Sequence, residues 1–145
     1  MKTSIIEVAL PTANVSAIQS VLEQCLLETG DLLIGRQTYG DQTLLVVRIF
    51  GDSIPAHLKT LAPAFYNEQI DSFQIIACHL FKIVFKTTAY ENTLRHFPLH
   101  MGESWFASSE ERNTAYLCLN VPNLRQEQIS WLATETSITQ WTGEL

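Results

Sequence analysis

The sequence predicts an α+β fold: a mostly antiparallel sheet with helices on one face, ferredoxin-like (split βαβ), with an additional C-terminal βαβ-like extension. Three observations lead to this prediction. Up to Thr87 the hydrophobic periodicities follow the order strand, helix, strand, strand, helix, strand. A further strand, helix and strand pattern ends the chain. No linker or low-complexity tract separates these parts, so residues 1–145 are expected to form a single domain.

The first helix has the clearest pattern. Apolar and β-branched residues from Ser4 to Leu10 predict a strand, and the segment from Pro11 to Asn14 supplies a break and a helix cap. The apolar residues that follow recur at three- and four-residue spacing, and Gly30 is the expected stop. They are Val15, Ile18, Val21, Leu22, Cys25 and Leu26. This one-sided pattern is typical of a helix that covers a sheet.

Two strands and a second helix are expected next. Residues 32–34 and 43–50 predict antiparallel neighbours, joined by a tight turn around residues 39–42. Residues 55–66 predict a helix that Pro63 would kink by removing a backbone donor.

The segment from Phe73 to Thr87 fits two interpretations. Part of its apolar pattern has helical spacing, and Asp71 with Gln74 would form a capping box. Ile75, Ile83 and Phe85 break that pattern, and the density of Ile, Val, Phe and Thr favours a strand. We expect a strand that is buried on both faces or broken in the middle.

The last third predicts short elements. Residues 91–96 suit a short helix, residues 103–108 and 114–121 two strands around a polar turn, and residues 137–141 a final strand. Between these strands, Asn123 is expected to cap a helix, with Gln126 positioned to reach back. The passage from strand through Pro122 and Asn123 to helix resembles the one through Pro11 and Asn14. Duplication and chance both explain this likeness.

The charge distribution excludes some partners. Fifteen acidic and nine basic residues give a net charge of -6, and the basic residues form no cluster. A nucleic-acid or anionic-membrane partner is therefore not expected. A protein partner, basic in character, is compatible with this charge. The charged fraction of 17% is below the usual value of about 25%, which is compatible with a face covered by a partner or by a second copy in a homodimer.

The cysteines indicate a reducing compartment. Cys25, Cys78 and Cys118 each lie in an apolar run and form no CxxC pair, so we expect buried free thiols. The N-terminal segment lacks the apolar core of a secretory signal. A cytoplasmic location is the expectation.

The segment from His96 to Trp105 holds the densest set of reactive side chains. His96, His100 and Glu103 are of the types that bind zinc, and His79 would be a further ligand if its strand lay nearby. Pro98 interrupts the helix that would align the two histidines, and the HExxH order is absent. The alternative is a solvated loop whose aromatic residues close one end of the core. No catalytic residue, bound metal or cofactor is predicted.

Ser104 is a poor candidate nucleophile. It follows Gly102 and Glu103, but Phe106 occupies the position at which a nucleophile elbow needs its second glycine.

Four residues are candidates for protein binding. Trp105 and Trp141 lie on short predicted strands beside polar segments, where tryptophan commonly anchors partners. Glu110 and Glu111 lie in a turn that would suit a basic patch.

The first functional hypothesis is a non-enzymatic protein-binding module, such as an acidic inhibitor or immunity-type protein. The alternative is a small-molecule-sensing regulatory domain of βαββαβ type, whose copies pair through their sheets. A further alternative is a metal-dependent enzyme that uses His96, His100 and Glu103.

Overall fold

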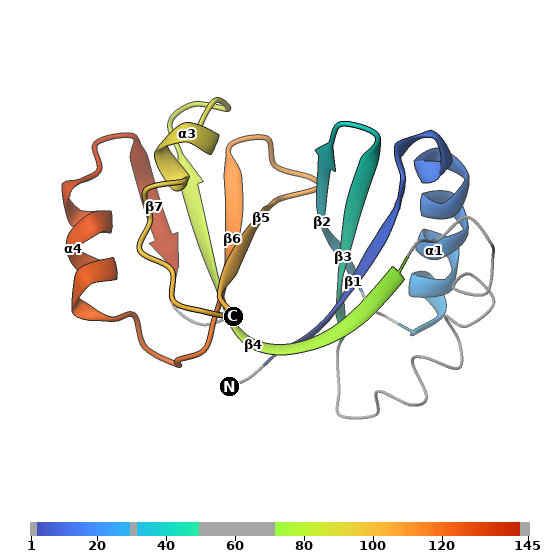
Figure 1. The fold of residues 1–145 in the computed structure, drawn as a ribbon, viewed down its shortest axis with the longest axis horizontal. Coiled ribbons are helices and arrows are strands. Elements are labelled where there is room, and N and C mark those ends of the chain that lie inside the picture. The colour runs from blue at the N-terminus through green and yellow to red at the C-terminus, as the bar shows by residue number, and fades with distance from the viewer. Residues whose placement is uncertain (1–2, 30–31, 50–71, 143–145) are drawn as a thin grey trace. The chain divides into compact units, whose positions relative to one another are not determined.

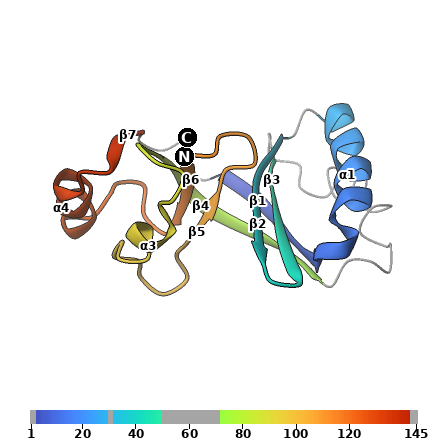
Figure 2. The same cartoon turned by 90° about the horizontal axis from the view of Figure 1, so that it is seen from above.

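The fold is α+β with a mostly antiparallel sheet. The computed structural model describes residues 3–29, 32–49 and 72–142. The chain divides into two compact units, an N-terminal unit, Thr3–Ala77, and a C-terminal unit that begins at Cys78. The elements of each unit can be followed in Figures 1 and 2.

The N-terminal unit is a split βαβ arrangement. Its strands have the order β2-β3-β1-β4, and β3 pairs antiparallel with both β1 and β2. Its described elements are β1 (Thr3–Pro11), the short 3₁₀ turn η1 (Thr12–Asn14), α1 (Val15–Thr29), β2 (Leu32–Tyr39), β3 (Gln42–Ile49) and the first part of β4 (Ser72–Phe85). The predicted helix at residues 55–66 lies outside the described residues.

A single hydrophobic cluster joins α1 to the sheet of the N-terminal unit. Alternate residues of β1 and β3 share a face because side chains alternate along a strand. The residues of α1 at three- and four-residue spacing pack on this face, as predicted. The cluster contains Ile6, Val8, Leu10, Val15, Ile18, Leu22, Leu26, Leu45, Val47 and Ile49. Full burial of each such side chain stabilises the fold by about 1.5–3 kcal/mol.

Segment 73–87 forms a strand, so the strand interpretation is confirmed and the helical one is wrong. β4 is one strand of 14 residues. It pairs antiparallel with β6 over His79–Val84 and with β7 over Lys82–Phe85. Its centre is buried on both faces, because the neighbouring residues Leu80 and Phe81 are only 1% and 3% exposed. This double burial explains why the segment shows no alternation of apolar and polar residues.

The C-terminal unit has the same strand order as the N-terminal one. After β4 come α3 (Glu91–Leu94), β5 (Ser104–Ala107), β6 (Thr114–Leu119), α4 (Gln126–Thr134) and β7 (Ile138–Thr142). These strands are ordered β7-β4-β6-β5. In this unit β4 is the first strand along the chain. In both units the last strand lies beside the first, the first beside the third, and the third beside the second. The expected C-terminal extension is therefore part of a second complete split βαβ unit, which shares the long strand β4.

The two Pro-Asn passages are not equivalent in this repeat. Pro11 ends β1, the first strand of its unit, whereas Pro122 follows β6, the third strand of the other unit. Their likeness therefore does not mark the repeat.

The core of the C-terminal unit is rich in aromatic residues. Tyr90 stacks on Phe85 with ring centroids 4.6 Å apart and meets the edge of Trp105 at 6.3 Å. Its hydroxyl donates to the carbonyl of Thr114 at 3.0 Å. Burial, with a smaller effect of Glu91, raises the pKa of Tyr90 to about 12. The hydroxyl is therefore a fixed donor at neutral pH.

Helices and strands close this core together. α4 contributes Leu132 and α3 contributes Leu94, and both pack on the same cluster as Phe81, Ile83 and Leu117. Among the described residues, no helix combines the length and the apolar character that crossing a membrane requires.

Candidate functional site

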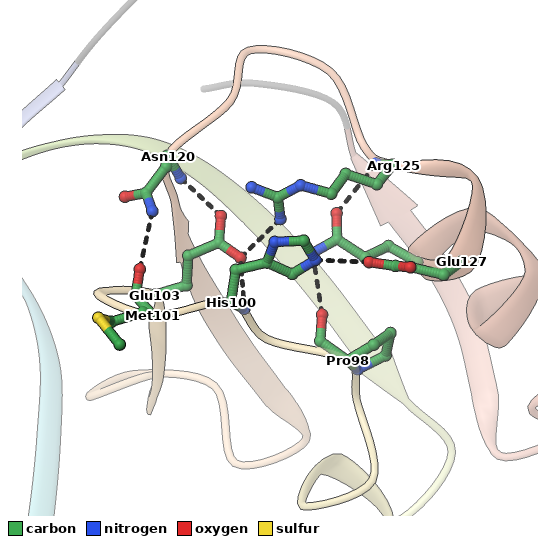
Figure 3. A network of polar contacts seen from close by, with 8 residues as sticks. Pro98, His100, Met101, Glu103, Asn120, Arg125 and Glu127 are labelled. Carbon is green, nitrogen blue, oxygen red and sulfur yellow. Dashed lines mark hydrogen bonds and ion pairs between the residues drawn. The ribbon is translucent and has the colours of Figure 1, made fainter.

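The densest polar network of the C-terminal unit is centred on Glu103. Its side chain is fully buried, with 0% of its surface exposed. One carboxylate oxygen accepts from the Arg125 guanidinium at 2.7 Å and from the backbone N–H of His100 at 2.9 Å. The other accepts from the backbone N–H of Asn120 at 2.7 Å (Figure 3). Three segments distant in sequence therefore meet at one carboxylate.

Further bonds hold the same loops in place. The Asn120 amide donates to the carbonyl of Met101 at 3.0 Å, and Gln128 donates to the carbonyl of Pro98 at 3.0 Å. His100 Nε2 lies 2.6 Å from the Glu127 carboxylate. We call the set of Pro98, His100, Met101, Glu103, Asn120, Arg125, Glu127 and Gln128 the Glu103 network.

The same contacts define the start of α4. The backbone N–H of Arg125 donates to Oε1 of Gln128 at 3.0 Å, so the helix begins after Arg125. The prediction that Asn123 caps this helix, with Gln126 reaching back, was wrong. The reaching side chain is Gln128, which is 0% exposed and also bonds Pro98. Gln128 makes these two hydrogen bonds at a buried position. They favour a helix start at Arg125 over one at the solvent-exposed Asn123.

The Glu103 carboxyl is held in its ionised form. Burial alone would raise its pKa, but the hydrogen bonds from Arg125, Asn120 and His100 outweigh it and hold the pKa below its usual range. A carboxylate with three donors around it is positioned to tie loops together. This arrangement offers no proton at neutral pH and therefore does not suit a general acid.

The three candidate metal ligands are not gathered around a common point. His100 contacts Glu127 and Glu103 contacts Arg125, while His96 is exposed where α3 ends. His79 is buried on β4. Within the described residues, no group of three His, Cys, Asp or Glu side chains is placed to hold a metal ion.

The candidate nucleophile Ser104 lies on a strand of the sheet. Ser104 begins β5 and pairs with Cys118 of β6, so it does not lie at a strand-to-helix turn. Cys78 and Cys118 are buried.

The four candidate partner-binding residues do not share one surface. Trp105 packs against the core cluster beside Tyr90. Trp141 is 43% exposed and lies opposite Ile83, on the side of the sheet that carries the helices. Glu111 pairs with Lys82. Because Lys82 is next to Ile83 along β4, the Lys82 side chain projects to the opposite side of the sheet. Glu110 is exposed in the same turn as Glu111.

Sequence reasoning missed Asn120, Arg125 and Glu127. Glu103 lies 22 residues from Arg125 and 17 from Asn120, so no local spacing connects them. The one sequence signal was the position of Arg125 in the first turn of the predicted helix.

Neither the family models nor the curated proteins gave a match to the sequence. Among solved structures, the fold is similar to an aspartate kinase from Clostridium acetobutylicum, with a TM-score of 0.47 and 12% identity. That match covers 80% of this chain, which spans 29% of the length of the kinase chain.

Two smaller proteins are matched over nearly their whole length. A protein from Bacteroides thetaiotaomicron has a TM-score of 0.43 and 13% identity over 99% of this chain and 93% of its own. A microcompartment protein from Desulfitobacterium hafniense has a TM-score of 0.44 and 10% identity over 98% of this chain and 93% of its own. These similarities are too low to assign a family or a function.

Proposed function

We propose that the chain is a non-enzymatic regulatory module that senses a small molecule. The observation that carries this proposal is the second complete split βαβ unit built on β4. The described strands form two units with the same strand order. The Glu103 network holds loops together. The proposal rests on an analogy of fold and names no particular ligand.

A thermal-shift screen tests this proposal. A ligand that binds only the folded state raises the apparent stability in proportion to its concentration relative to its dissociation constant. Amino acids and nucleotides are the first panel. We expect at least one class of compound to raise the melting temperature in a saturable way, with binding confirmed by calorimetry. A flat response across both panels would count against the proposal.

A second proposal keeps the protein-binding module, an acidic inhibitor or immunity-type protein. It is supported by the exposed turn that carries Glu110 and Glu111, which would suit a basic partner. Affinity capture from a lysate of the source cells, followed by mass spectrometry, should recover one basic protein, and loss of that protein with Glu110→Lys would support the acidic turn as its contact. Recovery of this chain alone would contradict it.

The location that we propose for either function is the cytoplasm. The burial of Cys78 and Cys118 supports this setting, because cysteine in a reducing compartment commonly serves as a small apolar core residue.

A further inference from the structure

The outer edge of β7 is the least protected strand edge of the C-terminal unit. Among the described residues, β7 pairs with β4 alone. Its sequence, Ile-Thr-Gln-Trp-Thr, contains no charged residue and no proline. Four of its five residues are exposed, and Trp141 is one of them. An edge of this kind presents unpaired backbone donors and acceptors to another strand.

The outer strands β2 and β5 carry protections that β7 lacks. β2 has an irregularity between Leu33 and Gly35 and a charged residue, Arg36. β5 is only four residues long. β7 also has an irregularity, but it lies at the start of the strand, and the register from Gln140 to Thr142 is regular. Charges, bulges and shortness are the usual means by which strand edges avoid pairing.

We propose that β7 is the contact through which two copies of this chain pair, edge to edge and antiparallel. The absence of charge on β7 favours a second copy over a basic or acidic partner, because neither would find a complementary group on this strand. Antiparallel pairing of a strand with itself is self-complementary about a two-fold axis and needs no opposite charge.

Side-chain placement allows this pairing. Gln140 and Thr142 lie opposite Val84 and Lys82 on one side of the sheet, and Trp141 lies opposite Ile83 on the other. In the pair, polar side chains meet on one side and the two tryptophans approach on the other. Aromatic residues of this kind commonly dominate the energy of an interface.

The test is the mass of the protein in solution, independent of any ligand and therefore of the sensing proposal. Sedimentation over a broad range of concentrations should give twice the chain mass of 16.4 kDa. Gln140→Lys puts a positive charge on the pairing strand of each copy, so the two like charges come close together, and it should abolish the dimer where the wild type retains it. Ala133→Lys adds the same charge on the exposed side of α4 and should leave the dimer intact.

Hydrogen exchange on the unmodified protein supplies a second readout, which does not depend on whether a variant folds. Backbone amides of β7 should exchange more slowly as the protein concentration rises, while those of the exposed helix α4 should not change. Three results would overturn the proposal: a monomer at every concentration, a dimer that survives Gln140→Lys, or exchange in β7 that is independent of concentration.

Discussion

Glu103 is the residue whose role the structure defines most closely. Its buried carboxylate accepts hydrogen bonds from Arg125, His100 and Asn120, and it links the loop before β5 to the loop before α4. Replacing Glu103 by Gln keeps the shape but turns one acceptor into a donor that faces an N–H group. We expect Glu103→Gln to lower the free energy of unfolding by about 2–3 kcal/mol, measured by urea denaturation.

A matched control separates this effect from the loss of a charge. Glu110→Gln removes the same charge from an exposed position in the turn before β6, and it should change the free energy of unfolding by less than about 0.5 kcal/mol. Equal effects of the two substitutions would mean that the Glu103 contacts do not stabilise the protein.

The low pKa of Glu103 also predicts a pH dependence. A group whose pKa is lower in the folded state contributes stability that is fully present above its unfolded pKa of about 4.3 and is lost as the pH falls through the folded value. Glu111, with its pKa lowered by Thr114 and Lys82, acts in the same direction. Glu103→Gln should therefore flatten the acid limb of a stability-against-pH curve without removing it. An unchanged slope would contradict the assignment.

For individual residues, the sequence predicted only part of the site. Glu103 stood out because two histidines lie near it, which suggested a metal ligand as one alternative. The structure places a guanidinium and two backbone N–H groups around it instead. Backbone donors carry no sequence signature, and Arg125 lies in a different loop, so the pattern of residues could not identify these partners.

Elements were predicted better than residues. The positions of β1, α1, β3, β6 and β7 agree with the periodicities within a few residues. The clearest of them, α1, packs one face on the sheet, and a single buried face leaves a regular apolar pattern in the sequence. β2 extends to Tyr39. The prediction ended at residue 34 because the second half of the strand is mostly polar, with Arg36, Thr38 and Tyr39 exposed.

β4 shows where periodicity is less informative. Residues 78–81 are all buried, so both sides of the strand require apolar side chains and the alternation disappears. The choice between helix and strand then depended on residue type alone. β-branched and aromatic residues favoured the strand correctly, but its pairing with β6 and with β7 depends on contacts distant in sequence.

For the whole molecule, the sequence predicted the first split βαβ unit and only part of the second. The second unit takes β4 as its first strand, and a strand that serves two units is counted once in a linear pattern of elements. Its helix α3 is also only four residues long, which gives little periodicity to detect. The remaining strand, helix and strand therefore suggested an extension and not a complete repeat.

The shared strand has a consequence for unfolding. If the C-terminal unit unfolds, residues 78–85 of β4 lose their partners in β6 and β7, and the outer strand of the N-terminal unit loses its continuation. We therefore expect calorimetry to show one transition whose calorimetric and van't Hoff enthalpies agree, as in a single domain. Two separate transitions would contradict the expectation that residues 1–145 behave as one domain.

A substitution in the shared strand tests this coupling directly. Ile83 is 0% exposed and lies between β6 and β7, so Ile83→Ala should lower the melting temperature by roughly 5–15 °C through loss of packing. Ile129→Ala, at a position 41% exposed on α4, makes the same chemical change and should shift it little. If the units are coupled, Ile83→Ala also speeds hydrogen exchange in β1 and β3 of the N-terminal unit. Exchange that accelerates only in β6 and β7 would show that the two units unfold independently.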